Sequence, residues 1–271
     1  MKVDEVKQIT SKALEELVTA LENGHSETLT AYLKTMSLFS KYSLNNLFLI
    51  ARQRPDARRV AGFQTWRKLG RYVRKGEKGI AIIAPLVRRK SDEESQPADD
   101  ERAIAGFKVA HVFSEEQTDG QPLAQIGQVA GDPGYYLSRL EEFVRENGVD
   151  LRYSDEIAPA RGMAEKGKIT LLPEQTPAET FSTLVHEVAH SEMHFGDRRR
   201  ETTKRIRETE AESVAYVVCS AIGLETGTAA QDYVGLYGGD SKLLLESLQF
   251  IQLTANRILT AIAPQNSATP A

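Results

Sequence analysis

Two histidines and a glutamate stand at a spacing that suits a metal ion. His186 and His190 are four residues apart, and Glu187 follows the first of them directly. Residues four apart on a helix lie one turn above each other, so both imidazoles can reach one tetrahedral ion from the same face. Such an ion lowers the pKa of a bound water, and Glu187 could accept the water's proton during attack on a carbonyl. The expected chemistry is peptide hydrolysis, with Glu187 as the catalytic base.

A third metal ligand must come from a second helix. His194 shares the face of the two histidines, but a rise of about 1.5 Å per residue places it about 12 Å from His186 along the axis. That separation is too large for one ion. Glu208, which stands eighteen residues after His190, is the predicted third ligand. The set expected for Zn²⁺ is therefore two imidazoles and one carboxylate.

The helix that carries Glu208 is predicted within residues 201–224. Glu212 lies one turn beyond Glu208, so we expect it to accept a hydrogen bond from a ligating histidine and fix the tautomer of that ring. Alternatively, Glu212 belongs to a solvated acidic edge of the helix. Glu210 is expected to point away from the metal.

The histidine segment has two simpler interpretations. A bare His-Glu-x-x-His arises by chance in roughly one chain in a hundred of this length. The apolar residues around it, from Leu184 to Ala189, also suit a core helix whose two histidines are satisfied by their neighbours. The third ligand that Glu208 offers favours the metal site over both interpretations.

At these residues the sequence resembles the zincin-like metallopeptidases with a glutamate as third ligand, including the ImmA/IrrE group. Their third ligand opens a pattern of Glu, two variable residues, Ala and an acidic or amide residue, which residues 208–212 match. The resemblance covers about residues 134–262 and implies a zinc-dependent peptidase domain. In these domains a strand comparable to the predicted strand 167–172 borders the cleft, where an extended peptide could add through backbone hydrogen bonds. An ordinary edge strand is the alternative.

Positive charge is concentrated in residues 52–90, where thirteen basic residues are opposed only by Asp56 and Glu77. Such a block attracts phosphates and gives an affinity that falls steeply with salt. Aromatic residues are interleaved with it, and a base stacked on an exposed ring contributes about 1 to 3 kcal/mol. This combination predicts binding to single-stranded DNA. The candidate DNA-binding residues are Asn45, Arg52, Trp66, Arg67, Arg71, Tyr72, Arg74, Lys75 and Lys78.

Several features of this block have a structural alternative. Phe63 and Trp66 could be core residues of a short helix, with the charges forming a solvated face. Gly76 and Gly79 permit either a turn whose amides meet a phosphate or a plain hairpin turn. Asn45 could contact a base, although capping of a nearby helix is the favoured interpretation.

Periodicity and turn residues predict the other elements of the chain. The polar, acidic stretch 91–101 is expected to be an exposed loop. Helices are expected at residues 3–22, 27–39, 43–52, 63–69 and 241–263, and strands at residues 80–84 and 107–113.

The first half resembles the N-terminal single-stranded-DNA-binding domain of the ArdC antirestriction proteins. Four blocks match in the same order, at residues 42–46, 62–66, 73–79 and 112–120. In that family the domain is joined to a zincin-like domain, so the resemblance covers nearly the whole chain and implies a mobile genetic element as its source. We therefore expect an α+β protein of two domains. These are an α/β single-stranded-DNA-binding domain at residues 1–128 and a mainly helical zincin-like metallopeptidase domain with a small sheet at residues 129–271.

The composition is that of a soluble globular protein, with 271 residues, 41% of them hydrophobic and 27% charged, and a net charge of -4. Its single cysteine, Cys219, cannot form an internal disulfide and lies in an apolar stretch, so packing is its expected role. The N-terminus lacks the apolar core of a signal peptide, and the longest apolar stretch, 214–224, is far shorter than the roughly 20 residues that span a bilayer. We expect a cytoplasmic protein with no membrane partner.

Three functional hypotheses follow from these features. The leading one is a single-stranded-DNA-binding protein with a zinc-dependent peptidase domain that acts on a protein substrate, in the antirestriction role implied by the ArdC resemblance. The second keeps DNA binding and makes the metal site only structural. The third is a regulatory metallopeptidase that cuts a partner protein in response to DNA.

Overall fold

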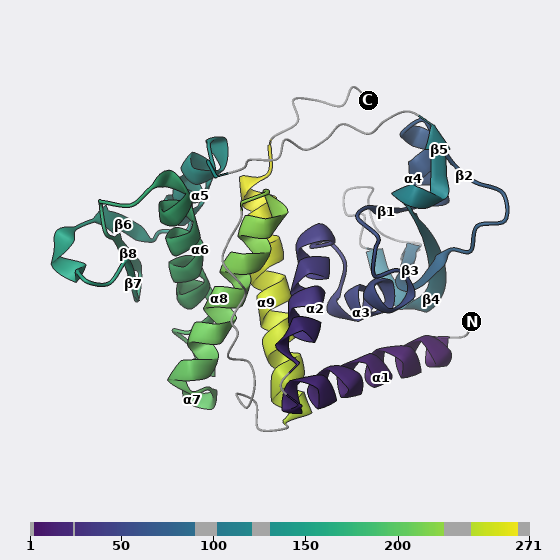
Figure 1. Cartoon of the computed structure of the whole chain (residues 1–271), viewed down its shortest axis with the longest axis horizontal. Coiled ribbons are helices and arrows are strands. Elements are labelled where there is room, and N and C mark those ends of the chain that lie inside the picture. Colours follow the sequence, from purple (N-terminus) through teal and green to yellow (C-terminus); the bar gives the residue numbers. More distant parts are fainter. Residues whose placement is uncertain (1–2, 24, 90–101, 121–130, 225–239, 265–271) are drawn as a thin grey trace, which may run out of the picture. The chain divides into compact units, whose positions relative to one another are not determined.

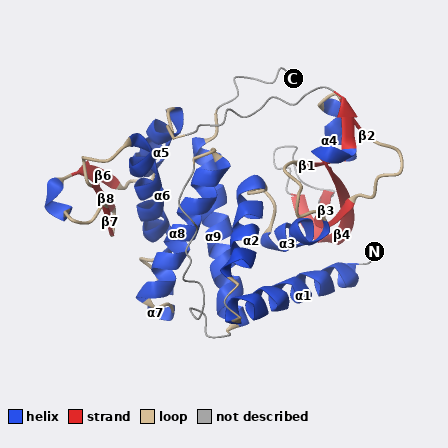
Figure 2. Cartoon of the chain, in the orientation of Figure 1, coloured by secondary structure: helices blue, strands red, loops and turns tan. Residues whose placement is uncertain are grey.

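The computed structural model describes residues 3–23, 25–89, 102–120, 131–224 and 240–264, so the acidic stretch expected as a loop at 91–101 lies outside the described residues. Helices predominate and the sheets are small (Figures 1 and 2), which confirms the predicted α+β class. No described helix combines the length and the apolar character needed to cross a membrane. The chain divides into two compact units, one of Met1–Glu15 with Asn45–Leu123 and one of Glu16–Leu44 with Ala124–Ala271.

The first unit is built on one three-stranded and one two-stranded antiparallel sheet. The order in the larger sheet is β1-β4-β3, and β2 pairs with β5 in the smaller one. Strands β3 and β4 are longer than the sequence predicted. The elements are α3 (Leu44–Gln53), β1 (Val60–Gly62), α4 (Phe63–Lys68), β2 (Arg71–Val73), β3 (Ile80–Arg89), β4 (Arg102–Ser114), the 3-10 turn η1 (Glu115–Gln117) and β5 (Thr118–Gly120), together with the first part of α1 (Val3–Glu22).

Helix α3 covers the free edge of strand β3 through two amide side chains. Asn46 donates from Nδ2 to the carbonyl of Ile83 at 2.9 Å and accepts from the Ile83 amide at 2.8 Å. Gln53 makes the same pair of bonds with Ala81, at 2.9 Å each. Both side chains therefore replace the backbone groups of a missing neighbouring strand, which protects the edge from pairing with another chain.

The second unit is mainly helical. Helix α8 (Lys204–Ala221) contacts α6 (Pro177–Met193), α9 (Ser241–Ile262) and α2 (Ser26–Leu38), as Figure 1 shows. The contact with α2 explains why residues 16–44 belong to this unit by packing, although the predicted boundary at residue 128 assigned them to the first domain. The remaining elements are α5 (Tyr135–Glu146), β6 (Asp150–Tyr153), the 3-10 turn η2 (Asp155–Ile157), β7 (Gly162–Glu165), β8 (Lys168–Leu171) and α7 (Arg198–Glu201).

Capping residues fix where the two helices of the predicted metal site begin. Thr176 and Glu179 form a capping box at the start of α6, and Pro177 occupies the first turn, where its missing amide hydrogen costs nothing. Thr203 caps α8 by accepting from the Ile206 amide at 3.2 Å. Both helices bury their apolar residues, so the histidines and Glu208 are held on rigid elements.

The small sheet of the second unit has the order β6-β8-β7. Strand β8 corresponds to the strand predicted at 167–172, and it lies in the centre, parallel to β6 and antiparallel to β7. The strand with a free edge next to α6 is β7, which the sequence did not predict. A short Gly-Met-Ala-Glu strand carries too little periodicity to stand out from a turn.

Candidate metal centre and nucleic-acid interface

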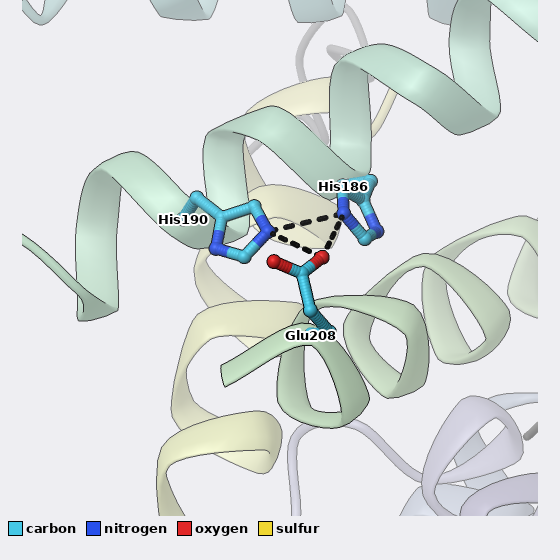
Figure 3. A group of neighbouring side chains, drawn as sticks. All are labelled: His186, His190 and Glu208. Carbon is cyan, nitrogen blue, oxygen red and sulfur yellow. Dashed lines mark hydrogen bonds and ion pairs between the residues drawn. The ribbon is translucent and has the colours of Figure 1, made fainter. Parts of the chain in front are cut away.

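His186 and His190 of α6 point toward Glu208 of α8, and the three side chains meet at one place (Figure 3). The Nε2 atoms of the two histidines lie 3.1 Å apart. The Glu208 Oε2 atom lies 3.5 Å from Nε2 of His186 and 3.4 Å from Nε2 of His190. The structure thus brings together the three residues that the sequence predicted as metal ligands.

These separations fit a metal ion. Ligand atoms bound at about 2.0 to 2.1 Å around a tetrahedral ion stand about 3.3 to 3.4 Å from one another. The three distances in the cluster lie on either side of that value. Among the described residues the cluster offers three ligand atoms, whereas structural zinc sites usually take four from the protein.

The electrostatics of the cluster keep two of its members in the form that binds a cation. Hydrogen bonding to His186 is the largest of the effects that lower the pKa of Glu208 to about 2. Burial is the largest of the effects that lower the pKa of His190 to about 4, and the nearby His186 adds to it. Near neutral pH, Glu208 is therefore ionised and His190 keeps a free lone pair.

Glu187 is buried beside the cluster, with 7% of its surface exposed. Burial raises its pKa, and a hydrogen bond from the backbone amide of Ala164 in β7 opposes that rise. The approach of β7 is close: a β-carbon placed on Gly162 would lie 2.7 Å from the Glu187 carboxylate. The carboxylate that the sequence assigned as the base is thus held by the edge strand of the sheet.

The residue predicted to support a ligating histidine is in a different place. Glu212 is exposed, and the Nδ1 atom of His190 instead contacts Nδ1 of His194 at 2.8 Å. Glu210, which we expected to point away, is fully buried and lies 2.9 Å from Nε2 of His194. No hydrogen bond joins Glu212 to His186 or His190 among the described residues, so its supporting role stays a prediction, whereas Glu210 is an interior residue because that side of α8 is covered as well.

The candidate DNA-binding residues of the first unit fall into two groups, and the first is exposed. Tyr72 of β2 has 60% of its surface exposed. The turn between β2 and β3 presents two lysines and an arginine, and α3 and α4 present the others. The exposed basic and polar candidates are Asn45, Arg52, Arg67, Arg74, Lys75 and Lys78.

The second group is buried and hydrogen-bonded within the first unit. Trp66 is 1% exposed, and its indole nitrogen donates to the carbonyl of Phe113 at 2.9 Å, so it cannot stack on a base. Arg71 is also buried and donates to the Thr118 hydroxyl at 2.8 Å and the Thr118 carbonyl at 3.0 Å. The structure therefore corrects the assignment of both residues as DNA contacts.

Acidic residues from within the basic block and from later in the chain reduce its charge. Arg74 pairs with Glu77 at 2.8 Å and with Asp119 at 3.4 Å. Arg59 lies 3.7 Å from Glu115. The sequence placed only two acids within the block, but strand β5 and the η1 turn bring further carboxylates to it.

Sequence reasoning missed one exposed aromatic residue. Phe107 of β4 has 57% of its surface exposed, although its neighbours Val109 and Phe113 on the same strand are partly buried. Single exposed apolar side chains are common on protein surfaces, so this exposure makes the ring available for stacking but does not by itself mark a binding surface. The available signal was its position in the predicted strand 107–113, where alternation alone does not tell which face is solvated.

Comparisons with known proteins agree with this architecture. Residues 4–113 match the family model of the N-terminal domain of anti-restriction factor ArdC. The fold resembles two crystal structures of antirestriction protein ArdC from plasmid R388, one metal-free and one bound to Mn(II), with TM-scores of 0.51 and 0.53 and identities of 21% and 20%. Each match covers 94% of this chain and 97% or 98% of the other.

A sequence relative is an uncharacterized protein of Bacillus anthracis, which is 21% identical. The match includes 96% of this chain but 52% of that protein, so the chain spans about half the length of the curated relative it matches. The chain therefore matches the ArdC N-terminal domain over residues 4–113 and has the fold of ArdC over nearly its whole length.

Proposed function

We propose that this protein binds single-stranded DNA through its first unit and hydrolyses peptide bonds with a Zn²⁺-dependent site in its second unit. The observation that carries the peptidase is the meeting of His186, His190 and Glu208 beside a buried Glu187. Two imidazoles and a carboxylate suit Zn²⁺ and other first-row divalent ions. The Mn(II) found in the R388 ArdC structure supports a metal in this fold.

The chemistry divides between the ion and the protein. A divalent ion held by the three ligands supplies Lewis acidity toward a water molecule and a peptide carbonyl. Glu187 accepts the proton of the attacking water and returns it to the leaving amine. Burial raises the pKa of Glu187 and so brings its basicity closer to neutral pH, while the Ala164 amide keeps the carboxylate in position.

Strand β7 is the place where an extended substrate would bind. It is the outer strand of the β6-β8-β7 sheet, and its Gly162 and Ala164 lie against Glu187. A peptide that pairs with the free edge of β7 through backbone hydrogen bonds would pass close to the base. The predicted peptide-binding edge therefore moves from β8 to β7.

DNA binding is assigned to the exposed members of the first unit. Tyr72 and Phe107 offer rings for stacking, and Lys75 and Lys78 offer charge for phosphates. This chemistry tolerates any base sequence, which suits a protein that meets incoming single strands. We propose an antirestriction role on the strength of the ArdC-like fold and domain.

The test of the peptidase combines metal analysis with proteolysis of an unfolded substrate such as casein. We expect one ion per chain, retained by Glu187→Gln without hydrolysis and lost from Glu208→Gln. The matched control is Glu212→Gln, which removes an exposed carboxylate one turn from Glu208 and should keep both the ion and the activity. A wild-type protein that binds no ion overturns the proposal. Full activity in Glu187→Gln would exclude Glu187 as the base.

The same variants address the two other hypotheses. If a chelator lowers the melting temperature while neither wild type nor Glu187→Gln cleaves any protein, the ion is only structural. If cleavage of a co-purified protein requires added single-stranded DNA, the regulatory peptidase is favoured.

A further inference from the structure

A chain of buried polar contacts runs from the back of the His190 ring into the core of the second unit. The Nε2 atom of His190 faces Glu208, whereas its Nδ1 atom lies 2.8 Å from Nδ1 of His194. On the far side of that ring, Nε2 of His194 lies 2.9 Å from Oε2 of Glu210. His194 is 1% exposed and Glu210 is not exposed at all, so water cannot replace either partner.

Arg198 fixes the charge at the end of this chain. Its guanidinium makes two bonds to the Glu210 carboxylate, the Nε bond at 3.2 Å and a shorter one from Nη2, and it also donates to the Ser247 hydroxyl at 2.9 Å. The ring of Phe250 lies 4.1 Å from the guanidinium carbon. Both oxygens of the Glu210 carboxylate therefore accept from Arg198.

These contacts determine where each hydrogen must lie. Both oxygens of Glu210 accept from Arg198, and Oε2 also faces Nε2 of His194, so that nitrogen carries the hydrogen of their contact. If His190 holds a cation through Nε2, its Nδ1 carries a hydrogen, and the Nδ1 of His194 that faces it must be the acceptor. The hydrogen between the two Nδ1 atoms therefore belongs to His190. The remaining nitrogen of His190, Nε2, is left with a lone pair directed at Glu208 and His186.

We propose that His194 and Glu210 are positioning residues that hold His190 in its Nδ1–H tautomer and aim its Nε2 lone pair at the metal. The inference rests on the proposed metal site and extends it by two residues that are not metal ligands themselves: His194 contacts His190, and Glu210 contacts His194. Supporting partners of this kind typically change metal affinity by roughly 10- to 100-fold when they are removed.

The decisive variants are at His194. His194→Phe keeps a planar ring of similar size and removes the acceptor for His190. His194→Asn places an amide oxygen near the position of the lost Nδ1, so it should restore the acceptor. Glu212→Gln, on α8 but exposed, is the control that should change nothing in this chain of contacts.

The first measurement uses metal-free protein and two-bond ¹H–¹⁵N spectra of the imidazoles, which distinguish the two neutral tautomers. The chain has five histidines, and loss of one signal set in His190→Gln assigns the ring. We expect the Nδ1–H tautomer of His190 in the wild type and in His194→Asn, and its loss in His194→Phe. The second measurement is metal affinity by chelator competition. We expect roughly 10- to 100-fold weaker binding in His194→Phe and recovery of most of that loss in His194→Asn.

The outcomes separate this inference from the proposed function. An Nε2–H tautomer in the metal-free wild type overturns the inference even if a variant fails to fold, because that spectrum needs no substitution. If His194→Phe keeps the wild-type tautomer of His190 and the wild-type metal affinity, the inference is overturned as well, but the proposed metal site is not. A wild type with the Nδ1–H tautomer and no affinity for Zn²⁺ overturns the metal site and leaves the hydrogen-bond chain intact.

Discussion

The backbone of Gly162 in β7 packs directly against the side chain of Glu187 in α6. A β-carbon built on Gly162 would lie 2.7 Å from both Cγ and Oε1 of Glu187, closer than real β-carbons approach other atoms. It would also lie 2.7 Å from the methyl carbon of Thr183. Only glycine at position 162 leaves room for the side chain of the proposed catalytic base. The close packing of β7 on α6 at this point depends on that glycine.

Gly162→Ala should displace the Glu187 carboxylate without touching a metal ligand. We expect hydrolysis to fall by roughly a hundredfold, since a misplacement of about 1 Å has effects of that size. Overpacking should also lower the free energy of unfolding by about 1 to 3 kcal/mol. Metal content should stay at the wild-type level, as measured on the same samples.

A matched control for that variant is Gly196→Ala in the same unit. A β-carbon at Gly196 would meet no atom within 4 Å, so this variant should keep the activity. Wild-type turnover in Gly162→Ala would show that β7 does not constrain Glu187.

Substitution of Trp66 should change the stability of the fold, and substitution of Tyr72 should change the affinity for single-stranded DNA. Trp66→Phe removes the donor to the partly buried Phe113 carbonyl and should lower the free energy of unfolding by about 1 to 3 kcal/mol with unchanged affinity for single strands. Tyr72→Ala should weaken binding by about 1 to 3 kcal/mol and leave the stability unchanged. Denaturant titrations and fluorescence anisotropy of a labelled oligonucleotide measure the two quantities. If only Trp66→Phe lost affinity, the assignment of Tyr72 as a DNA contact and of Trp66 as a core residue would be contradicted.

A similar contrast holds between exposed and buried basic residues. Each of Lys75→Ala and Lys78→Ala should reduce the slope of log affinity against log salt by about 0.7, because one phosphate contact is lost. Arg71→Met should instead destabilise the fold by about 1.5 to 3 kcal/mol through its lost bonds to Thr118. Titrations at several salt concentrations test this, and an unchanged slope in both lysine variants would exclude that turn from the binding surface.

The elements that could be predicted from the sequence are those with a strong local pattern. The four-residue spacing of His186 and His190 fixes their common face on any helix, and a helix at residues 3–22 was predicted with the bounds that α1 has. Glu208 could be predicted as the third metal ligand because that ligand had to come from a second helix, and a carboxylate stands near the start of that helix. Each of these inferences requires only the period of the helix.

Side-chain direction within short elements could not be predicted in the same way. Trp66 stands among basic residues in the sequence, but α4 is a helix of only six residues and turns its indole inward. The burial of Glu210 and the exposure of Glu212 have a related cause. Which face of α8 is solvated depends on α6, α9 and α2, and their arrangement is a tertiary property that charge patterns do not contain.

Cys219 should be unreactive in the folded protein. Its side chain is fully buried, and burial raises the pKa of its thiol to about 12. Because it is the only cysteine, a thiol reagent should label no group in native protein and one group after addition of denaturant. Rapid labelling of the native protein would show that α8 opens locally.

The metal-free protein should lose stability as the pH falls, and His190 should cause part of that loss. Its pKa is about 4 when folded, below the value of about 6.5 for an unfolded chain, so the unfolded state binds the proton more tightly between these values. Stability from this residue is thus present above about pH 6.5 and is lost as the pH falls toward 4. His190→Gln should remove this dependence, by about 1 to 2 kcal/mol, in urea titrations at pH 7 and pH 5 with a chelator present. Glu208, whose pKa is lowered from 4.5 to about 2, contributes a separate loss only below about pH 4.5, so equal pH dependence of wild type and His190→Gln between pH 7 and pH 5 would contradict the burial of a neutral His190.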